Sequence, residues 1–357
     1  MKRICLVIPS LRNGGAERVI SELANLWSAN NVLKIYLVIL AKQKHFYAID
    51  ERVVIIEPDR AYKATPIGRF FYKLWVLLFI RSTYKKIKPD TLLSFCEIYN
   101  NIVLLSLFFT SGRKFVSDRN SPYNNIGTIN NWLRNKLYRK ATGIVAQTDT
   151  AKTILRQNTR NKNVIVIPNP LREIRDYKTE VKTDSNIILN VGRNVPQKNQ
   201  IELIKIFHKC NMNNWTLKIL GDGPLRSELQ NTITELQLEN NVYLIDFNAD
   251  IDKYYSEAKI FAFTSIFEGF PNALSEAMAH GLACVSYDCP TGPRDMIVDG
   301  ENGFLIPLNE QDIYVEKFKL LMSSDKLRLK FRESAIKHKI KFDMKNIADK
   351  YLSFILN

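Results

Sequence analysis

Residues 264–277 read TSIFEGFPNALSEA, and this stretch decides the fold of the second half of the chain. The apolar segment 260–263 before it predicts a buried strand. Residues 273–280 are rich in Ala, Leu, Met and Glu, which favour a helix. Gly281 follows where the end of a helix needs a residue that adopts positive φ. We therefore expect a strand, a tight glycine loop and the start of a helix in succession.

The start of this predicted helix offers chemistry as well as structure. Its first backbone N–H groups lack partners within the helix and the helix dipole adds positive charge, so a phosphate or a sugar hydroxyl can bind there. Pro271 suits the first turn, because its missing N–H is not needed. Glu276 is equally consistent with compensation of the helix dipole, whereas Glu268, in a loop at a strand end, indicates function.

The length and composition of the chain indicate a globular protein of two domains. A chain of 357 residues exceeds one ordinary core, and 46% hydrophobic with 24% charged residues is a globular composition. The five cysteines are scattered, and the four histidines lack the spacing of metal ligands, so no metal site is expected. No signal peptide is expected, because the apolar run at residues 4–8 is too short.

The excess of positive charge lies in the first half of the chain. Residues 1–185 contain 31 Lys and Arg against 14 Asp and Glu, whereas residues 186–357 contain 20 against 22. We therefore expect the first half to face an anionic partner, which could be nucleic acid, a membrane surface or a phosphorylated acceptor.

Residues 68–88 contain an apolar run with basic residues on both sides. The run is far shorter than the roughly 20 residues that span a bilayer. One interpretation is a helix packed in the core with solvated ends. The other is a helix that lies in a membrane interface, with its cations on anionic head groups or on a diphosphate. The cations that would make this contact are Arg69, Lys73, Arg81 and Lys85.

Strands and helices alternate through the first half. A strand at 2–9 leads through a pair of glycines to a helix at 19–27, as in the first turn of a Rossmann-like unit, although the usual glycine fingerprint is absent. A further strand is expected at 89–95, and a helix at 102–109. The polar segment 179–185 is typical of a linker.

The second half starts the same pattern again. A strand at 186–191 leads into a loop that contains Arg193 and Lys198, and a helix follows at 200–209. Two cations beside a helix start would neutralise a diphosphate without a metal, and ordinary surface charge is the alternative. The domains that we expect from the whole pattern are 1–180, 181–340 and a last helix at 341–357.

Four motifs, in this order and spacing, resemble the family 4 glycosyltransferases of the GT-B fold. They are NGGAER at 13–18, Gly192-Arg193 with Lys198-Asn199, GDGP at 221–224, and EGFPN at 268–272 followed by Glu276-Ala277. The likeness extends over nearly the whole chain. It implies an α/β protein of two Rossmann-like domains that face a central cleft, with the C-terminal helix crossing back to the N-terminal domain.

The resemblance also implies a nucleotide-sugar donor on the second domain and an acceptor on the first. It implies retention of anomeric configuration, with no metal and no other cofactor. Arg193 and Lys198 would hold the donor diphosphate and, with Glu268, act in catalysis. Glu276 would take the ribose hydroxyls, and Glu268 those of the transferred sugar. The other donor contacts would be Gly15, Gly192, Gly269, Phe270, Pro271 and Asn272.

Two loops narrow the resemblance to a subgroup. Residues 117–122 (SDRNSP) stand where many relatives have a histidine near the donor sugar, so Arg119 or Asn120 would serve instead. Residues 288–294 (DCPTGPR) look like the bacterial branch that builds capsule, O-antigen or exopolysaccharide. That branch adds N-acetylhexosamines or hexoses, here expected from a UDP-sugar, to polyprenyl-diphosphate-linked glycans. The basic first half fits such an acceptor and a peripheral position on the cytoplasmic face of the inner membrane.

Other functions stay open at this point. A glycosyltransferase of the same family with a soluble acceptor, such as a free sugar or a protein, is the main alternative. A membrane-binding GT-B protein without activity and a UDP-sugar epimerase of similar fold are two more. Nucleic acid is not expected as a partner, because no basic and aromatic RNA-binding motif occurs and the motifs above would be unexplained.

Overall fold

The computed structural model describes residues 1–12, 14–59, 66–174, 186–247 and 250–357. These residues form two compact units. The first consists of Met1–Pro170 together with Met344–Asn357, and the second of Leu171–Asp343. The linker that the sequence predicts at 179–185 lies outside the described residues.

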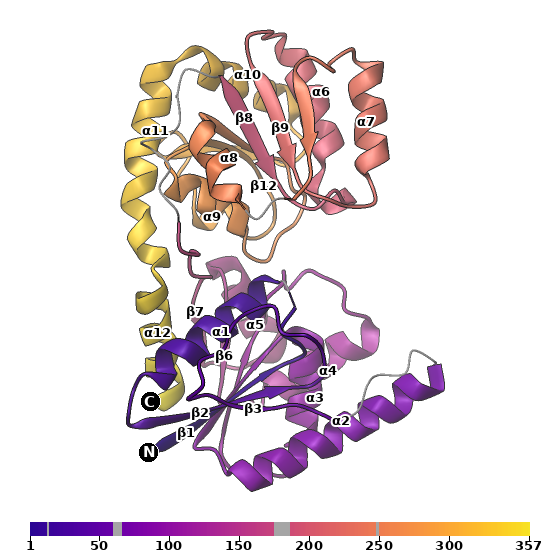
Figure 1. Cartoon of the computed structure of the whole chain (residues 1–357), viewed down its shortest axis with the longest axis vertical. Helices are drawn as coiled ribbons and strands as arrows, with labels where there is room; N and C mark the ends of the chain where they lie inside the picture. The colour runs from indigo at the N-terminus through magenta and orange to yellow at the C-terminus, as the bar shows by residue number, and fades with distance from the viewer. Residues whose placement is uncertain (13, 60–65, 175–185, 248–249) are drawn as a thin grey trace. The chain divides into compact units, whose positions relative to one another are not determined.

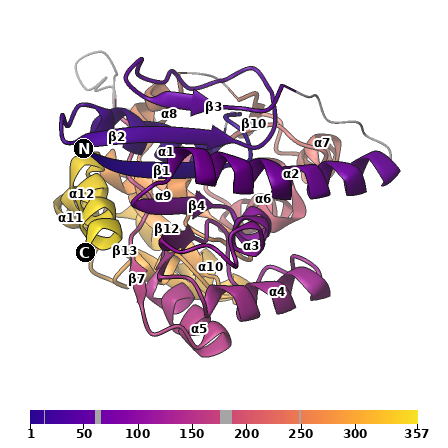
Figure 2. The same cartoon turned by 90° about the horizontal axis from the view of Figure 1, so that it is seen from below.

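The first unit is a parallel sheet of seven strands in the order β3-β2-β1-β4-β5-β6-β7 (Figures 1 and 2). Its strands are β1 (Lys2–Ile8), β2 (Leu33–Ile39), β3 (Val54–Ile56), β4 (Thr91–Phe95), β5 (Arg113–Ser117), β6 (Gly143–Ala146) and β7 (Val164–Val166). Its helices are α1 (Gly15–Ser28), α2 (Pro66–Ile87), α3 (Glu97–Ser106), α4 (Thr128–Tyr138), α5 (Asp149–Thr159) and α12 (Met344–Leu356).

Helices cover both faces of this sheet, because apolar side chains fill both faces of its central strands. In β1, Ile4 and Leu6 pack with α1 and α12, whereas Cys5 and Val7 pack with α2 and α3. Figure 2 shows α2, α3 and α4 next to one another, with α3 between the other two. This doubly wound arrangement is the one that the alternating pattern of the sequence predicts.

The last helix belongs to the first unit, although the whole second unit precedes it in the chain. Ile347, Tyr351 and Ile355 recur at intervals of four residues and are fully buried against α1 and the sheet. The C-terminal helix thus returns to the N-terminal domain, which confirms this part of the expected fold.

The second unit is a parallel sheet of six strands in the order β10-β9-β8-β11-β12-β13 (Figure 1). Its strands are β8 (Ile187–Val191), β9 (Thr216–Leu220), β10 (Val242–Ile245), β11 (Ile260–Phe263), β12 (Ala283–Asp288) and β13 (Gly303–Pro307). Its helices are α6 (Gln200–Cys210), α7 (Arg226–Glu235), α8 (Ile251–Glu257), α9 (Asn272–Ala279), α10 (Gln311–Ser323) and α11 (Asp325–His338), with 3₁₀ turns η1 (Pro196–Lys198), η2 (Pro293–Asp295) and η3 (Lys339–Phe342).

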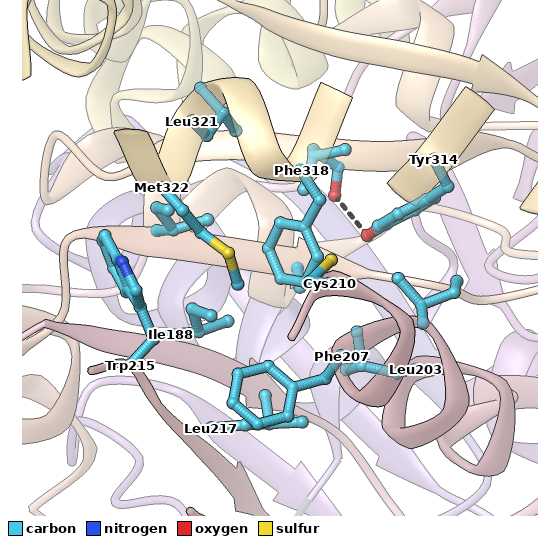
Figure 3. Close-up of a cluster of buried hydrophobic side chains, with 14 of the residues drawn as sticks. Ile188, Leu203, Phe207, Cys210, Trp215, Leu217, Tyr314, Phe318, Leu321 and Met322 are labelled. Atoms are coloured by element: carbon cyan, nitrogen blue, oxygen red, sulfur yellow. Dashed lines mark hydrogen bonds between the residues drawn. The ribbon is translucent and has the colours of Figure 1, made fainter. Parts of the chain in front are cut away.

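A large apolar cluster lies between this sheet and helices α6 and α10 (Figure 3). Phe207 and Trp215 meet Phe318 and Met322 there, and all four are almost completely buried. The hydroxyl of Tyr314 donates a hydrogen bond of 3.0 Å to the carbonyl of Val285, so its polar end is satisfied inside the core. This packing fixes one face of the strands whose ends form the candidate site.

Each sheet has one point at which the strand order reverses. In the first sheet it lies between β1 and β4, and in the second between β8 and β11. Loops after the carboxyl ends of two such strands diverge to opposite faces of the sheet and leave a crevice in which ligands of α/β proteins bind. A ligand is therefore expected to bind at these two edges.

Candidate functional site

Three loops meet at the reversal point of the second sheet. They follow β8 (residues 192–199), β11 (264–271) and β12 (289–295). The backbone joins the first two directly, because the N–H of Ile266 donates to the carbonyl of Gln197 at 2.9 Å. The hydroxyl of Thr291 in the third loop donates to the carbonyl of Glu268 in the second. The loops thus form one connected platform.

Lys198 and Glu268 form an ion pair at the centre of this platform. The ammonium Nζ lies 2.6 Å from Oε1 of the carboxylate, and the side chains are 17% and 8% exposed. The side-chain amide of Gln197 donates to the carbonyl of Phe267 at 2.8 Å and to Oε2 of Glu268 at 3.4 Å. The two charges that the sequence places in separate loops are therefore brought together.

Two glycines make room for this arrangement. A Cβ on Gly192 would lie 3.2 Å from two methylene carbons of Lys198, so the stem of the lysine packs directly on the glycine backbone. Gly292 has a φ of +104°, and a Cβ there would lie 2.5 Å from Pro271. A larger residue at either position would displace the charged pair or the start of α9.

Arg193 lies in the same loop as Lys198 but, within the described residues, its side chain has no partner. Its side chain is exposed and makes no hydrogen bond or ion pair with any residue that the structure describes. A long cation that is held by no neighbour costs little to reorient toward an anion. The platform therefore has one cation paired and one available.

The N-terminus of α9 completes this edge. Phe270 is buried, and Pro271 is the residue immediately before the helix, which begins at Asn272. Pro271 thus stands one position earlier than the first turn that the sequence predicts. Gly269 lies between Glu268 and Phe270 in the loop, so the predicted donor contacts 268–272 are contiguous with the helix start.

Glu276, one turn further along α9, is held by Arg172. The Nε of the guanidinium lies 3.3 Å from Oε2 of Glu276, and its two terminal nitrogens lie 2.7 and 2.5 Å from the carboxylate of Asp252. The ring of Tyr255 stacks on His280 beside this group, with centroids 4.8 Å apart. Glu276 is thus part of a charged network, which excludes simple compensation of the helix dipole as its sole role.

The predicted residues of the first unit lie at the equivalent edge of its sheet. Gly15 is the first residue of α1. Asn120 donates from its backbone N–H and its amide to the carboxylate of Glu97, at 2.7 and 2.9 Å. The guanidinium of Arg119 is buried, donates to the hydroxyl of Tyr351 at 3.0 Å and to Asn169, and faces away from solvent. The role of Arg119 and Asn120 toward an acceptor stays a prediction.

The cations predicted on α2 differ in how far their side chains are exposed. Lys85 is exposed, whereas Arg81 is partly buried and donates to the carbonyl of Ser106 at 3.2 Å. The side chains of Arg69 and Lys73 lie outside the described part of the structure. No helix in the described part of the chain is both long enough and apolar enough to cross a membrane.

Sequence reasoning did not find Arg172, Gln197, Thr291 or Glu97 as parts of these edges. Arg172 lies 104 positions from Glu276 in the chain, so no local pattern relates them. Thr291 stands in a loop that the subgroup resemblance had singled out, and this was the available signal. Among the described residues, no three or more His, Cys, Asp or Glu side chains are grouped so that they could hold a metal ion.

Two family models match the chain. The model for Glycosyltransferase Family 4 matches residues 13–173, and the model for Glycosyl transferases group 1 matches residues 172–338. The matches meet next to Leu171, where the second compact unit begins. Each unit therefore corresponds to one family domain.

Individual proteins agree with these matches. The chain is 29% identical over 369 residues, with 100% of both chains covered, to the N-acetylgalactosamine-N,N'-diacetylbacillosaminyl-diphospho-undecaprenol 4-alpha-N-acetylgalactosaminyltransferase of Campylobacter jejuni. It is 27% identical over 343 residues, with 94% of each covered, to the amylovoran biosynthesis glycosyltransferase AmsD of Erwinia amylovora. The structure of HepE of Anabaena with UDP-glucose matches with a TM-score of 0.78 at 18% identity, covering 99% of each chain.

Both domains match, relatives align end to end, and the fold agrees with a solved structure. Three of the motifs that suggested the family by resemblance, at 192–199, 221–224 and 268–277, follow neighbouring strands of the second sheet, whereas the motif that ends at Arg18 belongs to the first unit. The chain belongs to the family 4 glycosyltransferases of the GT-B fold.

Proposed function

We propose that this glycosyltransferase moves a sugar from a UDP-sugar to a polyprenyl-diphosphate-linked glycan in the synthesis of a bacterial surface polysaccharide. The sugar is GalNAc, GlcNAc or a hexose. The observation that carries the proposal is the pairing of Lys198 with Glu268 next to Arg193, which is exposed and has no side-chain partner among the described residues, at the reversal point of the second sheet. The names of the Campylobacter and Erwinia relatives support a polysaccharide product and, for the first, an undecaprenol-diphosphate acceptor and GalNAc.

The proposed chemistry starts with departure of UDP from the anomeric carbon. Negative charge grows on the β-phosphate as the carbon–oxygen bond breaks, and fixed cations lower the energy of that state. Lys198 has three N–H donors, so it can keep its bond to Glu268 and also contact the phosphate. Arg193 is the second cation, and the N–H groups at the start of α9 add further donors.

Glu268 serves in this proposal as a binding group for hydroxyls of the transferred sugar, not as a nucleophile. Its carboxylate is 8% exposed and held by Lys198, so it presents a fixed acceptor. The departing phosphate oxygen takes the proton of the acceptor hydroxyl, which attacks from the same face and gives retention. A trapped glycosyl adduct of Glu268, or a product of inverted configuration by NMR, would contradict this step. No metal or other cofactor takes part in it.

We place the acceptor at the cytoplasmic face of the inner membrane, and we propose that α2 contacts the membrane surface. Val76, Ile80 and Tyr84 of this helix pack into the core. Phe71 and Leu78 on the opposite face are 63% and 61% exposed. The helix α2 therefore carries apolar side chains on two faces, one packed on the sheet and one exposed.

The exposed face of α2 has the make-up of a helix that lies in a membrane interface. Phe71, Leu74, Leu78 and Lys85 follow one another at spacings of three, four and seven residues, which places them on one side of a helix. An exposed apolar stripe that ends in a cation fits an anionic bilayer surface, where the apolar side chains insert and the ammonium contacts phosphates.

Release of nucleoside diphosphate tests the proposal. A panel of UDP- and GDP-sugars is incubated with the protein and with membrane extract, and Glu268→Ala serves as the control. We expect release from one UDP-sugar that depends on the extract and is lost in the variant. Release without extract would favour the soluble-acceptor alternative, conversion of the sugar without any acceptor would indicate an epimerase, and silence over the panel would leave a membrane-binding protein without activity.

A further inference from the structure

We infer that Arg172 is a positioning residue that fixes the carboxylate of Glu276 for recognition of the donor ribose. The inference rests on the proposed function, in which Glu276 accepts hydrogen bonds from ribose hydroxyls. It adds a residue that lies outside the motifs of this site and that comes from the first positions of the second domain, two residues after Pro170.

The guanidinium of Arg172 joins two carboxylates from two helices. Its terminal nitrogens form a paired contact with Asp252 on α8, at 2.7 and 2.5 Å, and its Nε reaches Glu276 on α9 at 3.3 Å. The Nε2 of His280 lies 3.1 Å from Oδ1 of Asp252. The two terminal nitrogens of Arg172 are thus held by Asp252, and its Nε contacts Glu276.

The shape of the guanidinium makes this arrangement specific. A planar fork with five N–H donors can meet one carboxylate with two parallel bonds while its Nε points to another, whereas an ammonium is a point charge on a flexible stem. The side chains of Arg172 and Glu276 are 22% and 13% exposed, so the contact is only partly screened by water.

The backbone of Arg172 is anchored as well. The N–H of the preceding Leu171 donates to the carbonyl of Phe342 at 2.8 Å, within the second unit. Phe342 in turn contacts the ring of Phe270, which lies in the loop before α9, with centroids 5.8 Å apart. The arginine therefore approaches Glu276 from a fixed backbone position and not from a loose chain end.

An oriented carboxylate matters for a ribose, because the 2′ and 3′ hydroxyls present two donors with fixed separation. A carboxylate has about four acceptor positions, so one oxygen can bond to Arg172 while the group still accepts from the ligand. Without Arg172, Glu276 keeps its contact with Tyr255 but loses one of the groups that orient it, so more of its rotamers must be restricted on binding. Removal of Arg172 should therefore lower the preference for ribose without removing Glu276.

The test compares the binding of UDP with that of 2′-deoxy-UDP by calorimetry. One hydrogen bond to a charged group corresponds to about a 10- to 100-fold preference of the natural protein for UDP. In Glu276→Ala this preference should fall toward one. We expect a smaller fall in the same direction in Arg172→Ala, through weaker binding of UDP, while the Kd for 2′-deoxy-UDP changes by less than about twofold. Arg172→Lys should restore the preference in part at most.

Lys218→Ala is the matched control. Lys218 forms a 2.9 Å ion pair with Glu257 in the same domain, and its side chain is also 22% exposed. This variant should keep the natural preference for UDP. If Arg172→Ala weakened the binding of both nucleotides equally, or kept the preference for UDP, the positioning role would be wrong. If the alanine variant fails to fold, the same comparison is made with Arg172→Lys, provided that its melting temperature is unchanged. If the natural protein bound UDP without any preference over the deoxy form, Glu276 would not contact the ribose; if it did not bind UDP at all, the proposed function itself would fall.

Discussion

The carboxyl edges of the two sheets have the same reversal of strand order but hold their polar groups differently. In the first domain, Glu97 and Asp118 are 4% and 2% exposed, and Glu97 accepts bonds from the backbone of two neighbouring residues. In the second domain, Lys198 is partly exposed and pairs with another side chain, and Arg193 is exposed without a partner among the described residues.

This difference separates two uses of charge at equivalent positions. Charges that are buried and bonded to the backbone stabilise the loops of their own domain, and their removal leaves unsatisfied groups. Charged groups that bond to other side chains, one of them partly exposed as Lys198 is, can exchange partners when a ligand enters. We therefore expect substitutions of Glu97 or Arg119 at the first edge to lower stability and those of Lys198, Glu268 or Arg193 at the second edge to lower activity.

The largest effect should come from Glu268→Gln at the second edge. The amide keeps the shape of the side chain but loses the charge that holds Lys198 and the sugar hydroxyls. We expect kcat to fall by about 10²–10³-fold, with little change in the melting temperature. The rate of UDP release with membrane extract measures the first, and a thermal melt the second. A variant that retained a tenth or more of the natural rate would place catalysis elsewhere.

At the first edge, Arg119→Ala should chiefly affect folding. The guanidinium bonds to Tyr351 on α12 and lies over the ring of Phe95, with 4.7 Å from its carbon to the centroid. We expect a loss of about 2–4 kcal/mol in the free energy of unfolding, because buried partners are left unsatisfied. Urea denaturation measures this loss. Tyr351→Phe, which removes only the hydroxyl, should cost about 1 kcal/mol.

Arg193→Ala is the counterpart of Arg119→Ala in the second domain. Its free energy of unfolding should stay within about 0.5 kcal/mol of the natural value, since the side chain is exposed. Its kcat/KM should nevertheless fall, because the diphosphate loses a cation. Equal loss of stability in Arg119→Ala and Arg193→Ala would contradict the expected difference between the two edges.

The next effect is a pH dependence of stability from Asp118. Burial raises the pKa of this carboxyl to about 7, with a further contribution from the nearby charge of Glu97. In the unfolded chain the pKa is about 4. Between these values the native state binds more protons than the unfolded state, so the contribution of Asp118 to stability is fully present below pH 4 and is lost as the pH rises through 7.

Asp118→Asn removes this dependence and keeps an oxygen that can accept the 2.5 Å hydrogen bond from Tyr138. We expect the variant to be more stable than the natural protein at pH 8 by on the order of 1–2 kcal/mol, and the gain to shrink at pH 4. Urea unfolding at the two pH values measures it. A variant that is less stable at pH 8 would mean that the ionised carboxylate is bound favourably, for example by Arg134 at 4.0 Å.

The sequence alone predicted the second edge well. Gly269 and Pro271 mark the loop between strand and helix in the stretch at 264–277. The strand expected at 260–263 is confirmed, and α9 begins within one residue of the expected position. The two-domain α/β fold and its returning last helix are confirmed as well. Local patterns sufficed there because each motif combines its turn chemistry and its functional groups in one loop.

The first edge was less predictable, because its geometry depends on backbone strain and distant contacts. The helix expected at 102–109 begins at Glu97, directly after Cys96, which has a φ of +76°. A cysteine with positive φ is rare, so no turn residue marks this start. The network of Arg119 with Asn169 and Tyr351 joins residues 50 and 232 positions apart, which no local pattern records.

The smallest expected effect concerns the membrane contact that we propose for α2. Lys85→Ala should weaken binding to vesicles that contain anionic lipid by about fivefold at low salt, since one cation near such a surface contributes about 1 kcal/mol. The difference from the natural protein should vanish near 1 M salt, where the Debye length is about 3 Å. Vesicle sedimentation measures both.

The exposed Lys205 on α6, in the domain without an excess of positive charge, gives the matched control. Lys205→Ala should bind vesicles like the natural protein. Leu78→Ser removes an exposed apolar side chain from α2, so its loss of binding should persist at high salt, because burial of apolar surface in the bilayer is not screened. If Lys85→Ala and Lys205→Ala reduced binding equally, the basic first domain would act through its overall charge and not through the face of α2.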